Sequence, residues 1–378
     1  MNHKSKRRFL SKTMLSLFLL SSLTGCSKDT LPTLNNCKLT ENTKFESASV
    51  DISIEDFNAL GFSFGDSCDI TFSNGVKYLD VPYFNGYYVK NGDPIIVGYP
   101  SDTNVIITLN NTGIWFAAAL NDGDTVSISL KEKGKYLSTQ EALGQSYSLE
   151  RNEYDSDEQF SNFRSLEGGK LKKNLVYRGA SPIDNSRKRA AVTDSLLKKN
   201  GIQFVVDLAD SIENVQAYLA QEDFSSDYAK SLYEDGKMVL LSMSSSYGSQ
   251  AYMNSVAIGF GYILAEDGPY YIHCMEGKDR TGFVCMLLEA LCGASYEEMC
   301  SDYMMTYQNY YRITSEKTKE KYDAVVSLYF DSFMEFLTNE SDVETLRKAS
   351  YVEPAKQYLR DGGMSDEDID VLIDKLTK

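Results

Sequence analysis

The sequence predicts two domains of different class: a small all-β barrel or sandwich, followed by an α/β domain whose central sheet is flanked by helices. Short runs of β-branched and aromatic residues, separated by turn residues, fill the part before residue 149. After residue 160 the pattern changes to strands that alternate with helices. A chain of 378 residues with 42% hydrophobic and 24% charged positions is long enough to bury two such cores.

Residues 1–25 have the pattern of a secretory signal peptide. The first twelve positions contain basic but no acidic residues, and an apolar run follows from 14 to 23. This run is shorter than the roughly 20 residues that a membrane-spanning helix requires, which disfavours a transmembrane anchor. Its end, Leu-Thr-Gly-Cys, resembles a bacterial lipobox. The resemblance implies a lipid on Cys26 that anchors the mature chain, through a tether over 26–36, to the outer face of the bacterial cell membrane.

The charge and the histidine content narrow the classes of function. A formal net charge of −16 argues against a nucleic-acid partner, because neutralising the phosphates of a nucleic acid requires a basic face. The chain contains only two histidines, His3 and His273, which disfavours both a histidine-rich metal centre and a Ser-His-Asp triad with a spare histidine. We therefore expect neither a metal nor a cofactor.

The first domain is predicted over residues 37–149. Several strand-like runs alternate with Asn-Gly and Asp-Gly turns, which supply the positive φ angles of tight turns. A group of tyrosines between residues 78 and 99 could form a binding face, although aromatic side chains on strands more often pack in a core. Cys37 and Cys68 could form a disulfide, which the sequence alone does not decide. The role of this domain stays open.

An acidic linker is predicted over 150–160, before an α/β domain over 161–378. Four strand-like runs alternate with helical stretches in this domain: 175–177, 204–208, 239–241 and 270–273. The carboxyl-terminal part is mostly helical. One helix is expected to begin after Ser295, where Glu298 completes a capping box, and the last helix after Ser365.

The segment from 270 to 283 contains the residues best suited to chemistry. An apolar strand ends in His273, and a short polar loop leads into a helix. A loop in this position directs successive backbone N–H groups at one anion, and the helix dipole adds a favourable field. Cys274 and Arg280 enclose five residues. A curled loop would therefore place the Cys274 sulfur beneath a phosphorus atom while the Arg280 guanidinium holds two phosphoryl oxygens.

These residues predict phosphoryl transfer through a cysteine. The loop donors that bind phosphate also stabilise a thiolate on Cys274, which attacks a phosphomonoester and forms a phosphocysteine that water then hydrolyses. Thr281 is placed to donate a hydrogen bond to the sulfur as it leaves. The predicted substrate-binding set comprises Met275, Glu276, Gly277, Lys278, Gly282 and Arg178.

The stretch from His273 to Gly282 matches the H-C-x5-R-T-G signature of the cysteine-dependent protein tyrosine phosphatase superfamily. Its form, H-C-x-x-G-K-D-R-T-G, is similar to that of the bacterial branch of secreted tyrosine and lipid phosphatases. Three further stretches resemble that branch: Asn162–Gly169, Val176–Ala180 and Val205–Leu208. The resemblance covers roughly residues 162 to 378 and leaves the first domain unexplained. It implies a phosphorylated protein or a phosphoinositide as substrate.

Two aspartates are candidates for the general acid that protonates the leaving oxygen. Many relatives carry an aspartate on a mobile loop after a preceding strand, but the corresponding stretch 242–249 contains none. Asp279 lies within the anion loop by sequence and is favoured over Asp207, which stands at a strand end. Ser165 and Ala209 also depart from the pattern of the branch, which usually has aspartate and arginine at these positions.

Several of these side chains also have a structural interpretation. His273 is expected to orient the surroundings of Cys274 rather than to transfer protons. Lys278 is either a solvated surface charge or a second cation for polyanionic substrates. Arg164 and Arg178 are either buried ion-pair partners or substrate contacts. For the whole chain, the alternative to a lipid-anchored phosphatase is a catalytically weak surface lipoprotein that binds phosphorylated ligands.

Overall fold

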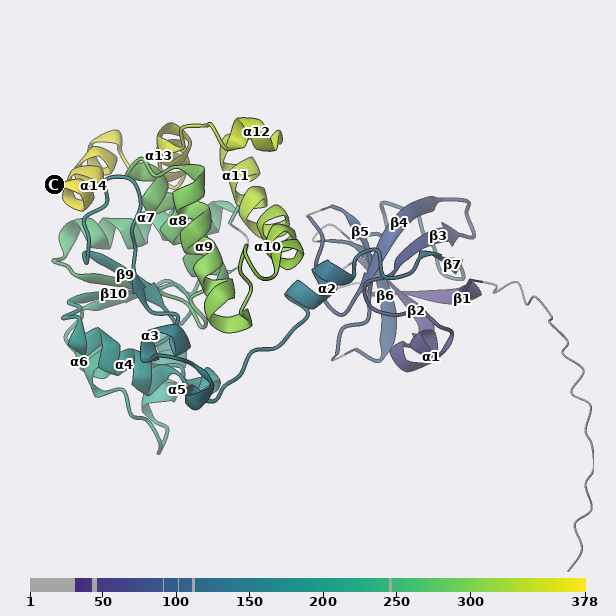
Figure 1. Cartoon of the computed structure of the whole chain (residues 1–378), viewed down its shortest axis with the longest axis horizontal. Helices are drawn as coiled ribbons and strands as arrows, with labels where there is room; N and C mark the ends of the chain where they lie inside the picture. The colour runs from purple at the N-terminus through teal and green to yellow at the C-terminus, as the bar shows by residue number, and fades with distance from the viewer. Residues whose placement is uncertain (1–30, 43–45, 91, 101, 111–112, 245–246) are drawn as a thin grey trace, which may run out of the picture. The chain divides into compact units, whose positions relative to one another are not determined.

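The computed structural model describes residues 31–378 except 43–45, 91, 101, 111–112 and 245–246 (Figure 1). The predicted signal peptide, the predicted lipidation residue Cys26 and the first part of the tether lie outside the described residues. Within the described ranges, no helix has both the length and the apolar character needed to cross a bilayer.

The first domain is a closed barrel of seven strands (Figure 1). The strands are β1 (Thr33–Asn42), β2 (Ser47–Ser53), β3 (Ser67–Phe72), β4 (Lys77–Phe84), β5 (Pro94–Val97), β6 (Asn104–Leu109) and β7 (Thr125–Glu132), and helix α1 (Ile54–Ala59) follows β2. Around the barrel their order is β1-β2-β6-β5-β4-β3-β7, with β4 and β5 parallel and the other neighbours antiparallel. Of the two all-β alternatives, the barrel is confirmed.

Alternating side chains fill the barrel interior. On β7, Val126, Ile128 and Leu130 are buried, whereas the residues between them are partly exposed. The turn between β3 and β4 contains Gly75 with φ of +89°, which confirms the positive φ predicted for the Asn-Gly turn. The local turn chemistry and the period of two therefore act together to build this domain.

The structure bears on two questions that the sequence left open in the barrel: the disulfide between Cys37 and Cys68, and the tyrosines as a binding face. Cys37 and Cys68 are free thiols, so the barrel forms without a disulfide between them. Among the tyrosines considered as a binding face, Tyr83 is buried in the barrel core. Tyr87 and Tyr99 are instead 43% exposed, with ring centroids 6.2 Å apart.

Three short helices follow the barrel in sequence: α2 (Leu137–Leu143), η1 (Arg151–Glu153) and α3 (Asp157–Phe160). The segment predicted as an acidic linker thus contains regular structure. Tyr154 and Phe160 are buried and pack with Tyr310 of helix α9 (Tyr296–Tyr311). This packing joins residues 154–160 to the core of the α/β domain.

The α/β domain contains a single five-stranded sheet among its described residues. Its strands are β8 (Arg164–Ser165), β9 (Val176–Gly179), β10 (Phe204–Asp207), β11 (Met238–Leu240) and β12 (Tyr270–His273). Their order is β11-β10-β12-β9-β8, and only β8 is antiparallel to its neighbour. Asp207 pairs with His273, which pairs with Gly179. The carboxyl ends of three parallel strands therefore meet at one edge, where α/β proteins usually place their ligand sites.

Helices cover both faces of the sheet (Figure 1). One layer comprises α4 (Ala190–Lys199), α5 (Ile212–Leu219) and α6 (Asp227–Glu234), which pack with Val205 and Tyr271. The other comprises α7 (Gln250–Ala265), α8 (Asp279–Leu291), α9, α13 (Val352–Asp361) and α14 (Asp366–Thr377), which pack with Val206 and Ile272. The remaining elements are η2 (Asn185–Arg187), α10 (Lys319–Val325), η3 (Val326–Phe330), α11 (Asp331–Thr338) and α12 (Val343–Leu346).

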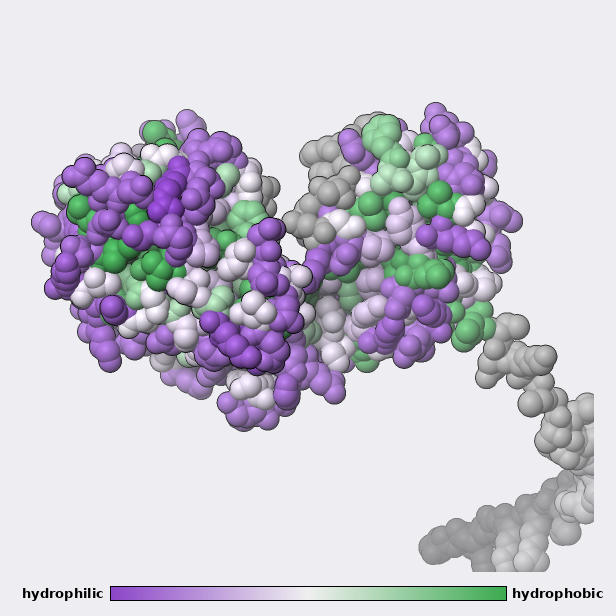
Figure 2. Space-filling view, turned by 90° about the horizontal axis from the view of Figure 1, so that it is seen from above, coloured by the Kyte–Doolittle hydropathy of each residue, from purple (hydrophilic) through white to green (hydrophobic). Residues whose placement is uncertain are grey.

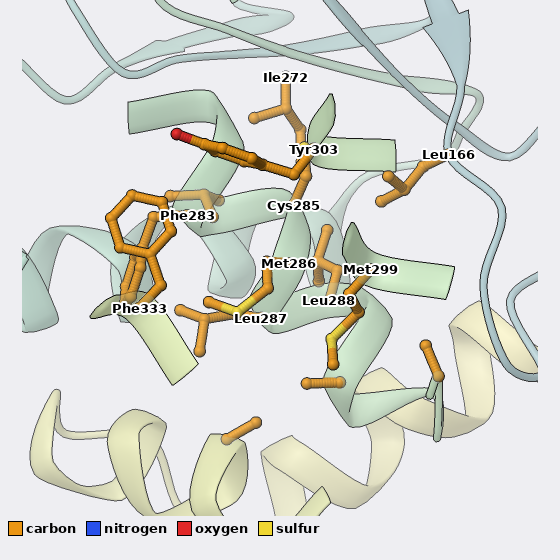
Figure 3. Packing of buried hydrophobic residues seen from close by; sticks show 14 of the residues in the cluster. Leu166, Ile272, Phe283, Cys285, Met286, Leu287, Leu288, Met299, Tyr303 and Phe333 are labelled. Carbon is orange, nitrogen blue, oxygen red and sulfur yellow. The ribbon is translucent and has the colours of Figure 1, made fainter. Parts of the chain in front are cut away.

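Helix α8 is enclosed by its neighbours. Every residue from Thr281 to Leu291 is buried. Figure 3 shows Phe283, Cys285, Met286, Leu287 and Leu288 of this helix together with Ile272, Met299, Tyr303 and Phe333 from surrounding elements. A helix that is packed on all sides holds the loop before it on a rigid base.

The outer surface is different in character. The faces of the domains seen in Figure 2 are mainly hydrophilic, with apolar residues in small separate areas. The most exposed large apolar side chains include Leu79 and Phe116 of the barrel and Ile258 and Val371 of the α/β domain. Scattered apolar residues of this kind are normal on globular proteins.

Candidate active site

Loop 274–278 joins the carboxyl end of β12 to the amino end of α8, which confirms the predicted strand, loop and helix. Strand β12 lies between β10 and β9, and α8 is buried, so both ends of the loop are fixed. The first N–H groups of a helix have no partner within it, and the helix dipole places partial positive charge there. The loop thus occupies the position of an anion-binding loop.

The peptide groups of the loop share one orientation. Their carbonyl oxygens accept hydrogen bonds from outside: Met275 from the N–H of Ser181 (3.1 Å), Glu276 from the Tyr310 hydroxyl (2.8 Å), and Gly277 from the side chains of Asn162 (3.1 Å) and Arg178 (3.0 Å). In a trans peptide the N–H points away from the carbonyl, so the N–H groups of residues 276–278 point to the inner side of the loop. Within the described ranges, no atom accepts a hydrogen bond from these three groups.

Gly277 is required for this curl. Its φ is +66°, in the region that side-chain-bearing residues rarely adopt. A Cβ atom at this position would lie 2.2 Å from the carbonyl oxygen of Gly179 at the end of β9. The loop therefore approaches the neighbouring strand so closely that only glycine fits.

Cys274 and Thr281 stand on either side of the loop. Cys274 directly follows β12 and is 4% exposed. Thr281 lies in the first turn of α8, and its buried hydroxyl has no hydrogen-bond partner among the described residues. A buried hydroxyl costs free energy unless it is bonded, so this donor is kept at a cost to stability. An uncommitted donor is what the predicted role of Thr281 toward the leaving sulfur requires.

Arg280 is the second residue of α8 and is half-buried. Its Nη1 donates to the carbonyl of Met243 at 3.0 Å, in the segment after β11. A guanidinium has five N–H donors in a fixed plane. In the described part of the chain this is the one hydrogen bond from the Arg280 side chain, so the other donors are left to hold phosphoryl oxygens.

A buried ion-pair network, whose acidic partner the sequence did not reveal, lies next to the loop. Asp302 of α9 accepts hydrogen bonds from Nε of Arg164 at 2.6 Å and from Nη1 of Arg178. Burial would raise the pKa of Asp302, but the charges of Arg164 and Arg178 hold it below its ordinary value. The Arg178 side chain is 1% exposed. Of the two roles considered for these arginines, the structure shows the buried ion pair.

The same network holds the loop in place. Arg178 and Asn162 both donate to the carbonyl of Gly277, and the amide oxygen of Asn162 accepts from Arg164 at 2.7 Å. The arginines are fixed in turn by Asp302. The stretches Asn162–Gly169 and Val176–Ala180 therefore contribute residues that position the loop from behind.

His273 and Asp207 lie next to each other at the ends of paired strands, and both are fully buried. Nδ1 of His273 is 3.2 Å from the carbonyl oxygen of Cys274, and its Nε2 is 3.9 Å from Oδ2 of Asp207. Burial lowers the pKa of His273 to about 4 and raises the pKa of Asp207 to about 6. His273 thus contacts the loop backbone, as expected for an orienting residue.

Lys278 and Asp279 differ in exposure. The ammonium of Lys278 lies 6.0 Å and 5.8 Å from the ring centroids of Tyr307 and Tyr311, and 3.8 Å from the Asp279 carboxylate. The Lys278 side chain is 20% exposed, whereas that of Asp279 is 61% exposed. Of the two candidate general acids, Asp279 therefore has an accessible carboxylate, whereas Asp207 does not.

Glu276 belongs to the predicted substrate-binding set, but its carboxylate is held outside the loop. It accepts hydrogen bonds from the hydroxyl of Tyr147 and from Nε of Arg187 at 3.0 Å. Gly282, of the same set, lies in α8, where a Cβ atom would be 2.8 Å from the ring of Tyr303. Glu276 therefore contributes only its backbone N–H to the inner side of the loop. Gly282 allows α8 to pack closely against α9.

Two further observations concern charge and metals. Glu289 of α8 is buried, and burial together with the charge of Asp302 raises its pKa well above the ordinary value. Within the described ranges, no group of three or more His, Cys, Asp and Glu side chains is placed to hold a metal ion.

The model of a family described as the tyrosine phosphatase family matches residues 157–378. This range is more than half of the chain and contains the whole of the loop and its supporting network. The chain belongs to the tyrosine phosphatase family. The family assignment agrees with the resemblance seen in the loop sequence, and it supports a phosphatase activity for the α/β domain.

Solved structures give weaker likenesses. An uncharacterised conserved protein from Thermotoga maritima is 15% identical, with a TM-score of 0.22, over 25% of this chain and 35% of that chain. The chain thus spans about a third of that protein. P. aeruginosa TpbA is 18% identical, with a TM-score of 0.22, over 54% of this chain and 88% of that chain. These values are too low to bear on function. No curated protein matches the chain.

Proposed function

We propose that the chain is a phosphomonoester hydrolase of the protein tyrosine phosphatase type, which forms a phosphocysteine on Cys274. The observation that carries the proposal is the orientation of the loop, whose carbonyls bond outward and whose N–H groups turn inward between Cys274 and Arg280. Such a set of donors stabilises both a thiolate and a bound phosphoryl group.

The reaction is proposed to run in two steps. In the first, Sγ of Cys274 attacks phosphorus, the bond to the leaving oxygen breaks, and Asp279 gives that oxygen a proton. Arg280 holds two phosphoryl oxygens throughout. In the second step the Asp279 carboxylate takes a proton from water, the water oxygen bonds to phosphorus, and the sulfur leaves as a thiolate bonded by the Thr281 hydroxyl. Inorganic phosphate is released.

The proposed substrate is a phosphorylated protein or a phosphoinositide, because either fits a site that contacts mainly the phosphoryl group.

The proposed location is the outer face of the bacterial cell membrane, where a lipid on Cys26 would hold the enzyme. This proposal rests on the signal-peptide pattern and on Cys26. Labelled palmitate should enter the wild type and not the Cys26→Ala variant. Labelling of both proteins would contradict the anchor.

Hydrolysis of para-nitrophenyl phosphate in the presence of EDTA tests the activity. We expect Cys274→Ser to lower kcat/KM by at least about 1000-fold, because a hydroxyl is a far poorer nucleophile than a thiolate. Cys68→Ser is the matched control, since Cys68 is equally buried but belongs to the barrel core. Equal rates for wild type and Cys274→Ser would overturn the proposal and favour a surface lipoprotein that only binds phosphorylated ligands.

The role of Asp279 has its own test. Phenolate needs a proton to leave, whereas nitrophenolate leaves readily without one. Asp279→Asn should therefore slow the hydrolysis of phenyl phosphate much more than that of para-nitrophenyl phosphate. If both substrates slow by the same factor, Asp279 is not the general acid.

A further inference from the structure

Three buried polar atoms without a described partner lie at or just after the ends of β10 and β12, near Cys274. They are Oδ2 of Asp207, Oδ2 of Asp210 and Nε2 of His273. Asp207 and His273 are 0% exposed, and Asp210 is 6% exposed. Buried acceptors that face one another repel each other, which favours at least one proton among them.

The hydrogen bond on the opposite side of the imidazole shows where His273 carries its proton. Nδ1 lies 3.2 Å from the carbonyl oxygen of Cys274. A carbonyl oxygen can only accept, so Nδ1 is the donor. Nε2, 3.9 Å from Oδ2 of Asp207, is then a lone pair on a neutral ring or an N–H on a charged ring.

The surroundings favour the neutral ring. Burial lowers the pKa of His273 to about 4, and the positive charge of Arg280 acts in the same direction, against the attraction of Asp210 and Asp184. A neutral ring presents its lone pair to Asp207. An ionised Asp207 carboxylate would face that lone pair unfavourably, whereas a protonated carboxyl group would not.

Asp207 and Asp210 together supply the proton. Oδ1 of Asp207 accepts from the N–H groups of Ala209 at 2.8 Å and Asp210 at 3.1 Å, which leaves Oδ2 for the proton. Burial raises the pKa of Asp207 to about 6, and burial with the nearby charge of Asp207 raises the pKa of Asp210 to about 7. Two adjacent buried carboxyl groups do not readily ionise together, so such a pair retains one proton.

We propose that Asp207 and Asp210 are positioning residues that hold one proton between their carboxyl groups beside the neutral ring of His273, and thereby keep that ring bonded to the carbonyl of Cys274. The inference rests on the proposed function, in which Cys274 takes the phosphoryl group. The Nδ1 bond fixes the first peptide group of the loop. The retained proton removes one negative charge from the neighbourhood of a site that binds a dianion.

Groups from three other elements face the pair. Arg280 of α8 lowers the pKa of Asp207, and Asp184 from the segment after β9 raises that of Asp210. Tyr218 of α5 donates to Oδ1 of Asp210 at 3.2 Å. With pKa values of about 6 for Asp207 and about 7 for Asp210, the pair loses its proton as the pH rises through this range. Above this range the affinity for phosphate should fall, which appears as a rise in KM.

The small number of histidines makes a direct test possible. His3→Gln leaves His273 as the sole histidine of the full chain. With ¹⁵N-histidine labelling, purification through a tag without histidine, and NMR from pH 5.5 to 8.5, we expect a neutral ring protonated at Nδ1 throughout. Its Nε2 shift should move once, between pH 6 and 8, and Asp210→Asn should abolish that step. An imidazolium at pH 7, protonation at Nε2, or a step retained in Asp210→Asn would overturn the inference.

Kinetics separate this role from that of a general acid. Asn at position 207 keeps a neutral polar group beside Nε2 of His273, as a protonated carboxyl group does, but it cannot give a proton to a leaving oxygen. We expect kcat/KM for phenyl phosphate at pH 6 to be about tenfold higher in Asp207→Asn than in Asp207→Ala, because Asn keeps an oxygen that accepts from the N–H groups of Ala209 and Asp210. Equal loss in both would overturn the inference. An inactive wild type would instead defeat the proposed function, while the NMR result would stand by itself.

Discussion

The barrel and the α/β domain differ in whether their buried carboxylate oxygens have hydrogen-bond or ion-pair partners. Asp66 of the barrel is 1% exposed, but both of its carboxylate oxygens have partners: the N–H groups of Ser63 and Gly134 and the ammonium of Lys133. Asp207 of the α/β domain is 0% exposed, and its Oδ2 has no partner among the described residues.

The contrast extends to the whole described part of the chain. Eleven buried side-chain polar atoms lack a hydrogen-bond partner, and all belong to residues between 161 and 307. Four of them, on Asp207, Asp210, His273 and Thr281, lie near Cys274 or in the first turn of α8. An unpartnered buried polar atom costs about 1–3 kcal/mol, and natural proteins keep such groups mainly where function requires them. Among the described residues, the barrel pairs its buried side-chain polar atoms, whereas the α/β domain leaves some of them unpartnered, including those around its loop.

The largest expected effect concerns the buried ion-pair network. Arg178→Met removes one partner of Asp302 and one support of the loop, and it should lower the free energy of unfolding by about 3 kcal/mol. Lys135→Met is the matched change in the barrel, where Lys135 pairs with Asp80 and both side chains are about one-third exposed. Its unfolding midpoint in urea should stay almost unchanged. Similar shifts in the two variants would contradict the contrast between the domains.

A smaller effect is expected from glycines with positive φ in each domain. Gly277→Ala places a Cβ atom against the backbone of Gly179 and should lower kcat/KM by about 100-fold, because the loop must move away from its N–H orientation. Gly75 has a φ of +89° but nothing within 4 Å of its Cβ position. Gly75→Ala should therefore cost only about 1 kcal/mol of stability and leave turnover intact. A fully active Gly277→Ala variant would show that the curl of the loop is not needed.

The smallest effect is a difference in pH dependence. The folded pKa values of Asp207 and Asp210, about 6 and about 7, lie above the ordinary value of 3.8, so their contribution to stability is present below pH 3.8 and is lost as the pH rises through 6 and 7. His273 acts oppositely, and its contribution is lost as the pH falls through about 4. Hydrogen bonding from Lys135 and from Ser67 lowers the pKa of Asp80 in the barrel to about 2, so this carboxyl group does not titrate near neutral pH.

Unfolding in urea from pH 6.5 to 8.5 measures this difference. The wild type should lose stability over that range, and the Asp207→Asn/Asp210→Asn double variant should lose less. Asp80→Asn should leave the slope unchanged there, because Asp80 is already ionised. A slope that is the same in the wild type and the double variant would mean that the pair holds no proton near neutral pH.

Much of the fold could be predicted from local pattern, and the rest depends on long-range contacts. Asn-Gly turns and the period of two indicated the strands of the barrel, but its closure pairs β1 with β7, which lie far apart in sequence. The parallel pairing of the consecutive strands β4 and β5 was also not predicted. The short helices η1 and α3 were missed within an acidic stretch. Helices of three or four residues are not stable by propensity, and here the burial of Tyr154 and Phe160 holds the segment.

In the site, too, local sequence predicted some residues, whereas others depend on contacts between distant segments. Spacing alone identified Cys274 and Arg280, because the loop is contiguous in sequence. Asp302 was missed because it lies on a separate helix and belongs to no motif, although it shares a helix face with the buried residues Met299 and Thr306. Asp210 was missed since its importance comes from contact with Asp207, which burial creates and sequence does not show.

The most direct test of the central claim is to trap the intermediate. Wild-type enzyme mixed with para-nitrophenyl phosphate and denatured within milliseconds at neutral pH should yield, by peptide mass spectrometry, one phosphoryl group on the sulfur of Cys274. Cys274→Ser treated in the same way should yield neither that product nor turnover. A phosphoryl group on another residue, or continued turnover by Cys274→Ser, would contradict the account.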